Sequence, residues 1–570
     1  MIDYQTLTFD YARCREQQHA AAADAAFTHP VAVVGAGPVG LATAIDLAQQ
    51  GVPVVLVDDD CTLSTGSRAI CFSKRSLDIF DRLGCGDRMV DKGVSWNVGK
   101  VFRQDELVYT FNLLPDSGHR RPAFVNLQQY YVEGFLLERA RELPNLEIRW
   151  KNRVTEIAQR GEPGAADAHV ALTVDTPDGP YTLRARYVVA CDGSRSPLRK
   201  AMGLDSHGRT FRDRFLIADV KMEADFPTER WFWFDPPFHP NQSVLLHRQP
   251  DNVWRIDFQL GWDADPVLEK TPERVIPRVR ALLGPDVKFE LEWVSIYTFS
   301  CLRMDRFRHG NVLFAGDSAH LVSPFGARGA NSGFQDAENL AWKLAMVLDG
   351  RASDALLDTY ASEREYAADE NLRNSTRSTD FITPKSPVSR VFRDAVLTLA
   401  HEHPFARQLV NSGRLSVPAV LADSMLNTPD DDAFAGPMTP GAPCSDAPVE
   451  AIDGTPGWLL SKLGQQFTGL LFCDASTRPD PQTLQRVAQQ AAPLRLVIVL
   501  EDDAAQPEGL PDAATVVRDR EGLAASRYDA RPGTLYLIRP DQHVCARWRD
   551  ADAERVERAL KRALCVAGTA

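Results

Sequence analysis

The segment that most constrains the fold is a glycine-rich turn between two apolar runs near the start of the chain. Val31–Val34 is typical of a buried strand, a helical pattern follows up to Gly51, and residues 54–57 are typical of a second buried strand. The turn between the first strand and the helix contains Gly35, Ala36, Gly37, Pro38 and Gly40. This order of strand, G-x-G-x-x-G turn, helix and strand predicts a Rossmann-like β-α-β unit that binds a dinucleotide.

Each glycine of the turn has its own physical reason. Gly35 permits the tight turn, Gly37 lets the backbone approach a pyrophosphate, and Gly40 lets the helix pack on the strand. The N-terminus of the helix presents N–H groups to the anion. Asp58 ends the second strand, and we expect its carboxylate to accept a hydrogen bond from a ribose hydroxyl. The turn alone does not distinguish NAD from FAD.

Two further motifs follow apolar strands later in the chain. The strand 187–190 leads into Asp192-Gly193, and the strand 312–315 leads into Gly316-Asp317. A loop with a proline and two glycines comes next, followed by a long helix with an apolar stripe. Each of the two motifs thus stands at the carboxyl end of a predicted strand.

These three motifs, in this order, resemble those of the single-component FAD-dependent aromatic hydroxylases, the group A flavoprotein monooxygenases of the para-hydroxybenzoate hydroxylase type. The resemblance covers about residues 30–400. It implies that the glycine turn holds the ADP pyrophosphate of FAD, that Asp192-Gly193 serves the FAD phosphates and the nicotinamide cofactor, and that Gly316-Asp317 binds the ribityl and ribose side. Ala190-Cys191 departs from the Gly-Ala that is usual in the family. FAD is the implied cofactor, with NADPH or NADH as a transient co-substrate.

The resemblance also assigns residues around the flavin. It places Arg68 and Gln129 near FAD, with Gln128 as an alternative to Gln129, and it places Pro324 beside the C4a edge. The residues that open the following helix, and whose N–H groups would face the N1–C2=O edge, are Gly329, Ala330 and Asn331. A plain helix N-cap is the alternative role for Asn331.

Alternating strand patterns in residues 206–300 predict an antiparallel sheet that covers the flavin. Arg255, Asp257 and Gln259 share one face of their strand, and Trp254, Ile256 and Phe258 share the other, so one face should line the pocket. The candidates for the base that activates a phenol are His247, Asp257 and Tyr297. The candidates for holding a substrate carboxylate are Arg255 and Arg328, with an ordinary salt bridge as the alternative for Arg328. We expect His320 to be structural.

The predicted fold class is α/β, with several domains. An N-terminal extension (1–29) precedes a Rossmann-like FAD-binding domain, which is formed by 30–205 and 301–426 and includes a helical part at 350–426. The inserted sheet domain is 206–300, a Pro/Gly/Asp-rich linker spans 427–456, and 457–570 resembles the C-terminal thioredoxin-like domain of 3-(3-hydroxyphenyl)propionate and phenol hydroxylases. Cys473 has no cysteine three residues away, which argues against dithiol catalysis there.

Charge and cysteine content exclude several classes of function. There are 77 acidic and 64 basic residues, a net charge of −13, which argues against nucleic acid or an anionic membrane as the main partner. No apolar run is long enough to cross a bilayer. Ten cysteines without a C-x-x-C pair are typical of free thiols in the cytoplasm, and we expect no metal site. A homodimer is compatible with this composition.

The resemblance implies that the protein hydroxylates a phenolic ring with dioxygen and NAD(P)H, through a C4a-hydroperoxide of FAD, in the catabolism of aromatic compounds. A flavin-dependent halogenase is one alternative, because Trp231-Phe-Trp233 is similar to the W-x-W-x-I-P signature, although Asp235 replaces the isoleucine. Another FAD-dependent oxidase and a non-catalytic FAD-binding scaffold are the remaining alternatives. A chloride-dependent product would identify the halogenase.

Overall fold

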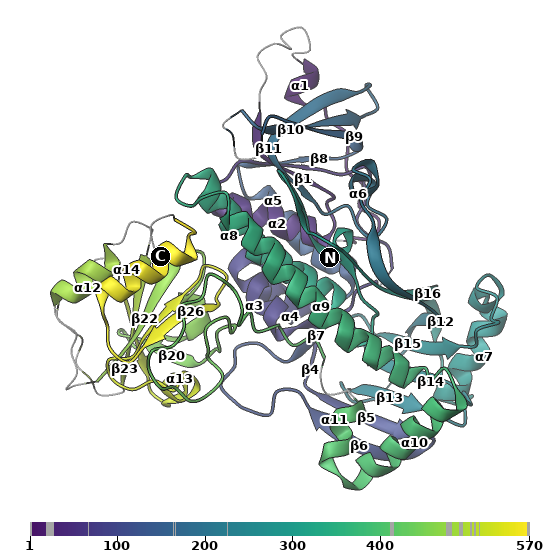
Figure 1. The fold of residues 1–570 in the computed structure, drawn as a ribbon. Coiled ribbons are helices and arrows are strands. Elements are labelled where there is room, and N and C mark those ends of the chain that lie inside the picture. The colour runs from purple at the N-terminus through teal and green to yellow at the C-terminus, as the bar shows by residue number, and fades with distance from the viewer. Residues whose placement is uncertain are drawn as a thin grey trace.

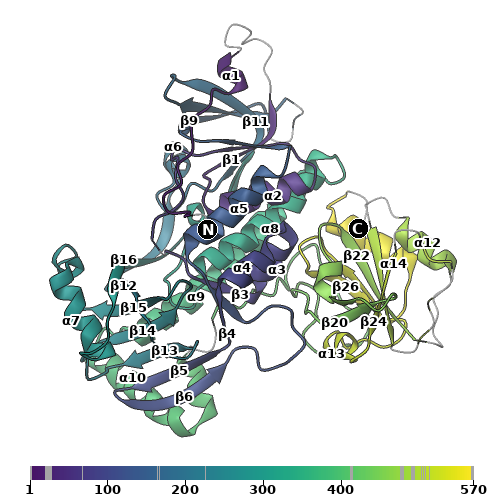
Figure 2. The same cartoon turned by 180° about the vertical axis from the view of Figure 1, so that it is seen from behind.

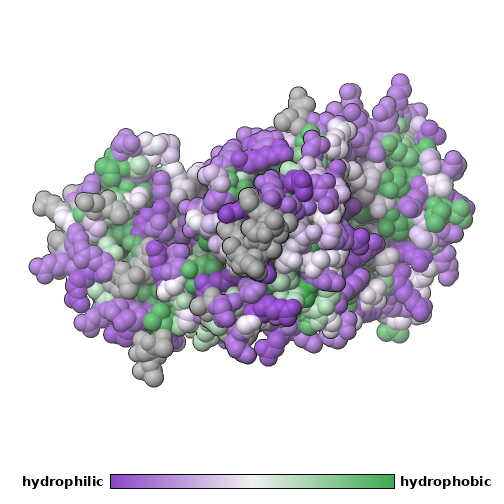
Figure 3. All heavy atoms as spheres, turned by 90° about the horizontal axis from the view of Figure 1, so that it is seen from above, coloured by the Kyte–Doolittle hydropathy of each residue, from purple (hydrophilic) through white to green (hydrophobic). Residues whose placement is uncertain are grey.

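The structure is a computed structural model, and it describes residues 3–566 except 19–27, 67, 163–164, 166, 225, 411–414, 475–480, 490–493, 502–503, 505, 507–508 and 512–513. Three lobes are evident: a central α/β body, a second sheet below it, and a C-terminal lobe at its side (Figures 1 and 2). Hydrophilic side chains cover much of the face seen from above, with smaller hydrophobic groups between them (Figure 3). The predicted α/β class is confirmed.

The first sheet forms the centre of the body. Its path runs through β17 (Arg308–His309), β18 (Val312–Phe314), β11 (Tyr181–Ala190), β1 (His29–Val34), β2 (Val54–Val57) and β8 (Leu146–Arg149). All but the edge strand β17 run parallel, so the carboxyl ends of β1, β2, β11 and β18 meet at one edge. The antiparallel strands β9 (Arg153–Arg160) and β10 (His169–Asp175) extend β11 away from that edge.

Helices pack against this sheet and against one another. The most extensive packing between two helices is that of α2 on α8, and α2 also packs on α5. The helices of the body are α2 (Pro38–Gln49), α3 (Lys74–Leu83), α4 (Gly86–Lys92), α5 (Gln129–Arg141), α6 (Pro197–Ala201), α8 (Gly329–Leu348) and α9 (Leu356–Ile382). A small sheet of β3 (Cys71–Ser73), β7 (Phe124–Asn126) and β4 (Val94–Trp96) lies beside the N-terminus of α3.

The second sheet has eight strands, and each of its faces contributes side chains to an apolar core. Its order is β19 (His320–Leu321), β16 (Glu290–Met304), β12 (Ser206–Lys221), β15 (Val253–Leu260), β14 (Ser243–Arg248), β13 (Arg230–Phe234), β5 (Val98–Arg103) and β6 (Glu106–Asn112). Trp254, Ile256 and Phe258 lie in a core with Val275 and Val279 of α7 (Pro272–Leu283). The opposite face, called the polar face below because it carries Arg230 and His247, also contributes Phe232 to a second core with Phe325 and Ile382 of the body. The helices α10 (Pro387–Glu402) and α11 (Pro404–Val410) lie near β5 and β6 (Figure 1).

The predicted boundaries of the sheet domain are too narrow. β5 and β6 fall inside the range assigned to the FAD-binding domain, yet β5 pairs in parallel with β13, more than 100 residues further along the chain. The pairing joins segments that are far apart in sequence, so no local pattern marks it.

The third sheet forms the C-terminal lobe. Its order is β21 (Pro456–Trp458), β20 (Pro448–Ala451), β24 (Thr515–Asp519), β23 (Leu494–Glu501), β22 (Phe467–Cys473), β25 (Leu535–Ile538) and β26 (Val544–Trp548). Its helices are α12 (Pro481–Ala488), α13 (Leu523–Arg527) and α14 (Ala553–Ala563). The predicted linker 427–456 is therefore too long, because β20 already belongs to this sheet. Both Pro448 and Pro456 stand at the first residue of a strand, where proline is tolerated.

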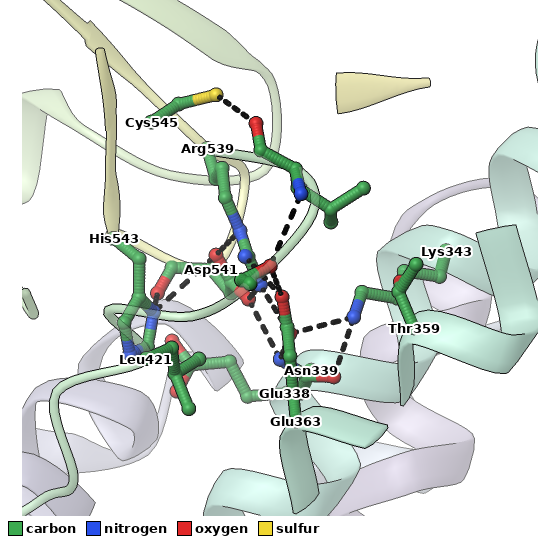
Figure 4. Close-up of polar contacts among 12 residues, drawn as sticks. Glu338, Asn339, Lys343, Thr359, Glu363, Leu421, Arg539, Asp541, His543 and Cys545 are labelled. Carbon is green, nitrogen blue, oxygen red and sulfur yellow. Dashed lines mark hydrogen bonds and ion pairs between the residues drawn. The ribbon is translucent and has the colours of Figure 1, made fainter. Parts of the chain in front are cut away.

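A buried group of charges joins the C-terminal lobe to the body (Figure 4). The guanidinium of Arg539 donates to both carboxylate oxygens of Glu363 on α9, at 2.7 and 2.9 Å, and to the carboxylate of Asp541. Lys343 of α8 donates to Glu363 at 2.7 Å. Beside this group, the rings of Trp342 and Phe467 pack edge to face with centroids 5.6 Å apart. The C-terminal lobe is thereby fixed on α8 and α9.

The described part of the predicted N-terminal extension packs onto the body. Tyr4 is buried against Tyr131 and Phe135, and Phe9 stacks on Trp150. The short helix α1 (Arg15–Gln18) follows, and most of the rest of the extension lies outside the described residues. Among the described residues, no helix is long and apolar enough to cross a membrane.

Candidate active site

The glycine turn leaves open space in front of α2. A Cβ on Gly40 would lie 1.8 Å from the carbonyl oxygen of Gly35, so only glycine lets α2 start this close to the turn. A Cβ on Gly37 would meet no described atom within 4 Å. No side chain of the described residues caps α2, so the N–H groups of its first turn face this space. The turn therefore fits a phosphate-bearing ligand.

Asp58 fixes the turn through hydrogen bonds to the backbone. Its carboxylate accepts from the N–H of Ala36 at 2.5 Å and from the N–H of Asp60 at 2.8 Å. Burial raises the pKa of Asp58, and these two N–H groups oppose the shift. The structure thus shows a supporting role for this carboxylate, and its contact with a ribose hydroxyl stays a prediction.

The Asp-Gly motif lies at the carboxyl end of β11. The carboxylate of Asp192 accepts from the hydroxyl of Ser196 at 2.7 Å and from the N–H of Leu198 at 2.9 Å, which stabilises the start of α6. Gly193 has φ +75°, and a Cβ there would meet no described atom within 4 Å. Arg199 donates to the carbonyl of Ser318 at 2.6 Å. This bond joins the Asp-Gly motif to the Gly-Asp motif across the sheet edge.

The Gly-Asp motif presents a carboxylate that the protein leaves unused. Asp317 follows β18, and no described residue donates a hydrogen bond to its carboxylate. Its side chain is reached by solvent, although much of the surrounding volume is protein. This burial raises the pKa of Asp317, and the nearby His320 opposes the shift. Among the acids of the three motifs, Asp317 is the one best placed to bind hydroxyl groups of a ligand.

His320 has a structural role, as predicted. Its Nε2 lies 2.6 Å from the carboxylate of Asp336, which also accepts from the N–H of Gly316 at 2.9 Å and from Arg364 at 2.7 Å. Burial alone would raise the pKa of Asp336, but His320 and Arg364 hold it below its ordinary value. This buried group fixes the backbone of the Gly-Asp motif.

Asn331 uses its whole side chain to join α8 to the small sheet. Its oxygen accepts from the N–H of Ser73 at 2.8 Å and the hydroxyl of Ser76 at 2.6 Å, and its amide donates to the carbonyls of Cys71 and Ala327. The alternative role as N-cap is wrong, because α8 starts at Gly329 with Arg328 in the cap position. The N–H groups of Gly329, Ala330 and Asn331 remain the groups that a helix N-terminus offers to a ligand.

In the first half of the chain, the residues predicted to lie beside the flavin are in the loop that contains Arg68 and at the start of α5, and a hydrogen bond joins the two segments. Gln129 donates to Glu133 at 2.8 Å and accepts from the N–H of Ala69 at 3.1 Å. Arg68 is exposed, and its carbonyl accepts from Arg255 at 3.1 Å. Gln128 is buried and donates to the carbonyl of Pro250 at 3.3 Å. Gln129 therefore positions the Arg68 loop.

The polar face of the second sheet brings two of the predicted bases together. Nε2 of His247 lies 3.6 Å from a carboxylate oxygen of Asp257 on the next strand. Nδ1 of His247 and the other oxygen of Asp257 have no partner among the described residues. Burial and the nearby Arg230 lower the pKa of His247 to about 4, so it is neutral at pH 7. A neutral imidazole with an unused nitrogen can accept a proton.

Tyr297 lies on the same face but nearer the nucleotide motifs. Burial raises its pKa to about 12, and the charge of Asp317 adds to the shift. Its ring packs 5.5 Å from that of Phe299. The structure thus separates Tyr297 from the His247–Asp257 pair and places it toward the Gly-Asp motif.

Both arginines predicted to hold a substrate carboxylate already have a partner within the protein. Arg255 donates to Asp219 at 3.1 Å, and a stacked Trp293 lies beside it. Arg328 is buried and donates to Asn371 at 2.9 Å, which braces the loop that carries Pro324. Pro324 itself is exposed in that loop. Arg255 thus forms a salt bridge with Asp219, and the salt-bridge alternative for Arg328 stays a prediction.

A third arginine, which the sequence did not single out, lines a cavity between the second sheet and the Pro324 loop. Arg230 begins β13 and shares its face with Phe232. The cavity is otherwise lined mainly by apolar groups: Phe111, Phe232, Phe325, Gly326, Ile382 and Leu415. In the sequence, Arg230 could have been noticed because it begins a strand rich in aromatic residues. The sequence does not show which face of that strand is turned toward the Pro324 loop, and this face decides whether Arg230 belongs to the site.

Comparison with known proteins decides the family. Residues 28–375 match the family described as FAD binding domain, and residues 447–563 match the one described as HcaD C-terminal domain. The chain belongs to the FAD-binding-domain family. This FAD-binding protein is 28% identical over 552 residues, 93% of its chain and 91% of the relative, to a 3-(3-hydroxy-phenyl)propionate/3-hydroxycinnamic acid hydroxylase of Mycobacterium sp. (strain JLS).

Two further similarities agree with this family. A probable NADH-specific resorcinol 4-hydroxylase of Rhodococcus jostii (strain RHA1) is 34% identical over 342 residues, which cover 59% of this chain and 62% of that one. The flavin-dependent monooxygenase PieE, solved with FAD and substrate, has a TM-score of 0.76 at 21% identity and covers 95% of this chain and 99% of its own. The predicted resemblance to group A flavin monooxygenases is confirmed, and so is FAD as the cofactor.

The residues of this FAD-binding protein fit that cofactor. The free space at Gly37, the N–H groups of α2 and α8, and the unused carboxylate of Asp317 match a pyrophosphate and the hydroxyl groups of a ribityl or ribose chain. All ten cysteines are free thiols. Cys191, which belongs to the Ala190-Cys191 pair that replaces the usual Gly-Ala, lies against Gly35 and Gly40 and leaves the turn open. The departure from Gly-Ala is therefore compatible with the cradle.

Proposed function

We propose that this FAD-binding protein hydroxylates a phenolic ring, with dioxygen and NADH or NADPH as co-substrates, in the breakdown of aromatic compounds. The observation that carries the proposal is the position of the polar sheet face, where the His247–Asp257 pair and Tyr297 lie on the side of the sheet that is turned toward the nucleotide motifs. The hydroxylase names of the relatives support the same reaction.

The protein's part in the reaction is to bind, orient and shield. When bound, FAD supplies the transfer of electrons from the pyridine nucleotide and the activation of dioxygen. The turn at Gly37 and the N-terminus of α2 would hold its pyrophosphate, and Asp317 would hold its hydroxyl groups. The first N–H groups of α8 would stabilise negative charge on the ring system. The loop from Pro324 to Arg328 would close the space between cofactor and substrate.

His247 would act on the phenol hydroxyl. Its Nδ1 has no partner among the described residues and would accept a hydrogen bond from the hydroxyl, while Asp257 faces Nε2 and fixes the orientation of the ring. The positive charge of Arg230 nearby favours the phenolate over the phenol. A phenolate ring is more electron-rich than a phenol and is the better acceptor of an electrophilic oxygen.

The test is a turnover assay over a set of phenols. The purified protein, loaded with FAD, is mixed with NADH or NADPH, a phenol and ¹⁸O₂, and the product is analysed by mass spectrometry. Phenol-dependent oxidation of the nucleotide and one ¹⁸O in a hydroxylated ring are expected. A halogenated product that requires chloride would identify a halogenase, and bleaching of FAD that no phenol accelerates would leave only an oxidase or a scaffold.

The halogenase alternative has little support from the placement of its signature. Trp231 and Trp233 lie on the apolar face of the second sheet, where both pack on Phe102 at centroid distances of 5.4 and 5.2 Å. This face is turned away from the nucleotide motifs, because the polar face of the same strands carries Arg230 and His247. The similarity to the halogenase signature therefore reflects core packing.

We also propose that the C-terminal lobe has a thioredoxin-like fold without dithiol chemistry. The parallel pair β22–β23, joined through α12, and the antiparallel strands β25 and β26, followed by α14, support the fold. Cys473 is buried, and burial raises its pKa to about 12, so it stays a thiol. The predicted structural role of this lobe agrees with its ionic attachment to α8 and α9.

A further inference from the structure

Arg230 differs from the other buried arginines of the described chain. It is 8% exposed, and no described residue forms a hydrogen bond or an ion pair with its guanidinium. Arg255 is bonded to Asp219, Arg364 to Asp336 and Arg539 to Glu363, and the remaining buried arginines also have partners. A buried charge without a partner is costly, because it has lost its hydration and gained nothing in return.

The groups around Arg230 do not neutralise it. The nearest acid in electrostatic terms is Asp257, which already faces His247. Cys71 also lies close, but burial raises the pKa of its thiol, so it carries no charge at pH 7. The result is that burial lowers the pKa of Arg230 against the pull of both groups. The protein keeps a cation here and leaves its counter-charge to be supplied from outside.

The cavity beside Arg230 defines what can supply that charge. Phe111, Phe232, Phe325 and Ile382 form an apolar wall around a volume of about 30 Å³, so the cavity takes the end of a ligand next to Arg230 rather than a whole aromatic ring. Gly326 belongs to the loop that follows Pro324, so the cavity touches the side of the fold predicted to face the flavin. A planar guanidinium in the lining of a mainly apolar cavity can bind a carboxylate through two parallel hydrogen bonds.

We propose that Arg230 binds the carboxylate of the substrate, so that this enzyme prefers phenols with an anionic side chain over neutral phenols. The inference rests on the proposed function for the identity of the ring and extends it to the class of substrate. A neutral phenol would bury the cavity wall but leave the cation unpaired, and it would bind more weakly for that reason.

Calorimetric titration of the FAD-loaded full chain tests this without turnover. The probes are 3-phenylpropionate and the uncharged 3-phenylpropan-1-ol, which differ in charge and lack the phenol hydroxyl. Arg230→Gln should weaken binding of the carboxylate roughly tenfold to a hundredfold, the usual cost of a lost charge-assisted hydrogen bond, and leave the alcohol unchanged. Arg230→Lys should recover part of the affinity for the carboxylate, because it keeps the charge.

Arg248→Gln is the matched control. Arg248 lies on the neighbouring strand but on the opposite face, with its guanidinium 5.7 Å from the ring of Trp254, so both probes should bind as to the parent protein. Equal losses for carboxylate and alcohol in Arg230→Gln, or no loss for either, would overturn the inference. So would a clearly lower Tm of Arg230→Gln, since removal of an unpaired buried charge should not destabilise the fold.

Failure of the proposed function would look different. If no phenol is hydroxylated but the carboxylate probe binds through Arg230, the anion site stands and the reaction must be another one. If phenols are hydroxylated with equal kcat/KM whether neutral or carboxylated, the reaction stands and the assignment of Arg230 is wrong.

Discussion

Replacement of Glu363 by glutamine should loosen the attachment of the C-terminal lobe. The carboxylate is 3% exposed and accepts hydrogen bonds from Arg539, Lys343 and Asn339 at 2.7–2.9 Å. Burial alone would raise the pKa of Glu363, but Arg539 and Lys343 overcome this and hold it well below its usual range. The acid is therefore charged at pH 7.

The expected loss follows from what the substitution leaves behind. Glutamine keeps the size of the side chain but removes the negative charge, and it turns an N–H₂ group toward two buried cations. Breaking a buried ion pair by removing one partner costs about 3–5 kcal/mol, because the other charge stays buried. Lys343 has a pKa lowered by burial to about 8 even with Glu363 present, so loss of the acid favours its deprotonation. This relief keeps the expected cost near the lower end of that range.

Glu450→Gln is the matched control. Glu450 also pairs with an arginine, Arg520, at 2.7 Å, but that guanidinium is half exposed and the pair contributes little. Urea unfolding is followed by the total tryptophan fluorescence, to which Trp342 at the joint contributes, and by release of FAD. Glu363→Gln should move the first transition to lower urea and speed proteolytic removal of the C-terminal lobe. Equal midpoints for the two variants would refute the reasoning.

Three further predictions concern single side chains. The pKa of His247 is about 4 in the fold and 6.5 ordinarily, so between these pH values the unfolded chain binds a proton that the native state does not. Acidification from pH 7 to 4 should therefore lower the free energy of unfolding by on the order of 3 kcal/mol through this group. His247→Gln should remove that part of the decrease when unfolding is measured across this pH range. Asp317→Ala should weaken FAD binding roughly tenfold to a hundredfold in a fluorescence titration, and an unchanged Kd would contradict its role in holding hydroxyl groups. Cys473→Ser should leave turnover within about twofold, because a buried thiol that stays protonated contributes to packing and not to the reaction. Loss of hydroxylation at unchanged FAD content and Tm would show that the reaction needs a thiol step.

Much of the nucleotide site could be predicted from the sequence. The turn from Gly35 to Gly40, its flanking strands and Asp58 lie within about thirty residues, so backbone sterics and hydrophobic periodicity specify them locally. The alternation in residues 254–259 likewise predicted two sets of side chains on opposite faces of β15, and the structure places Trp254, Ile256 and Phe258 in a core. Both features depend on neighbours in sequence, which a single chain reveals without a structure.

Pairing across the chain required the structure. Nothing local to residues 98–112 indicates that β5 lies in parallel beside β13, and the composition around Pro448 is typical of a linker although β20 is a strand. The ion-pair partners of the charged side chains could not be predicted from the sequence for the same reason. Arg255 and Arg230 look alike in sequence, but only Arg255 faces an acid, Asp219, across the sheet. Sequence determined the residues that make a nucleotide cradle, whereas tertiary packing decided which arginine stays without a partner, because an ion pair depends on the strand that lies alongside.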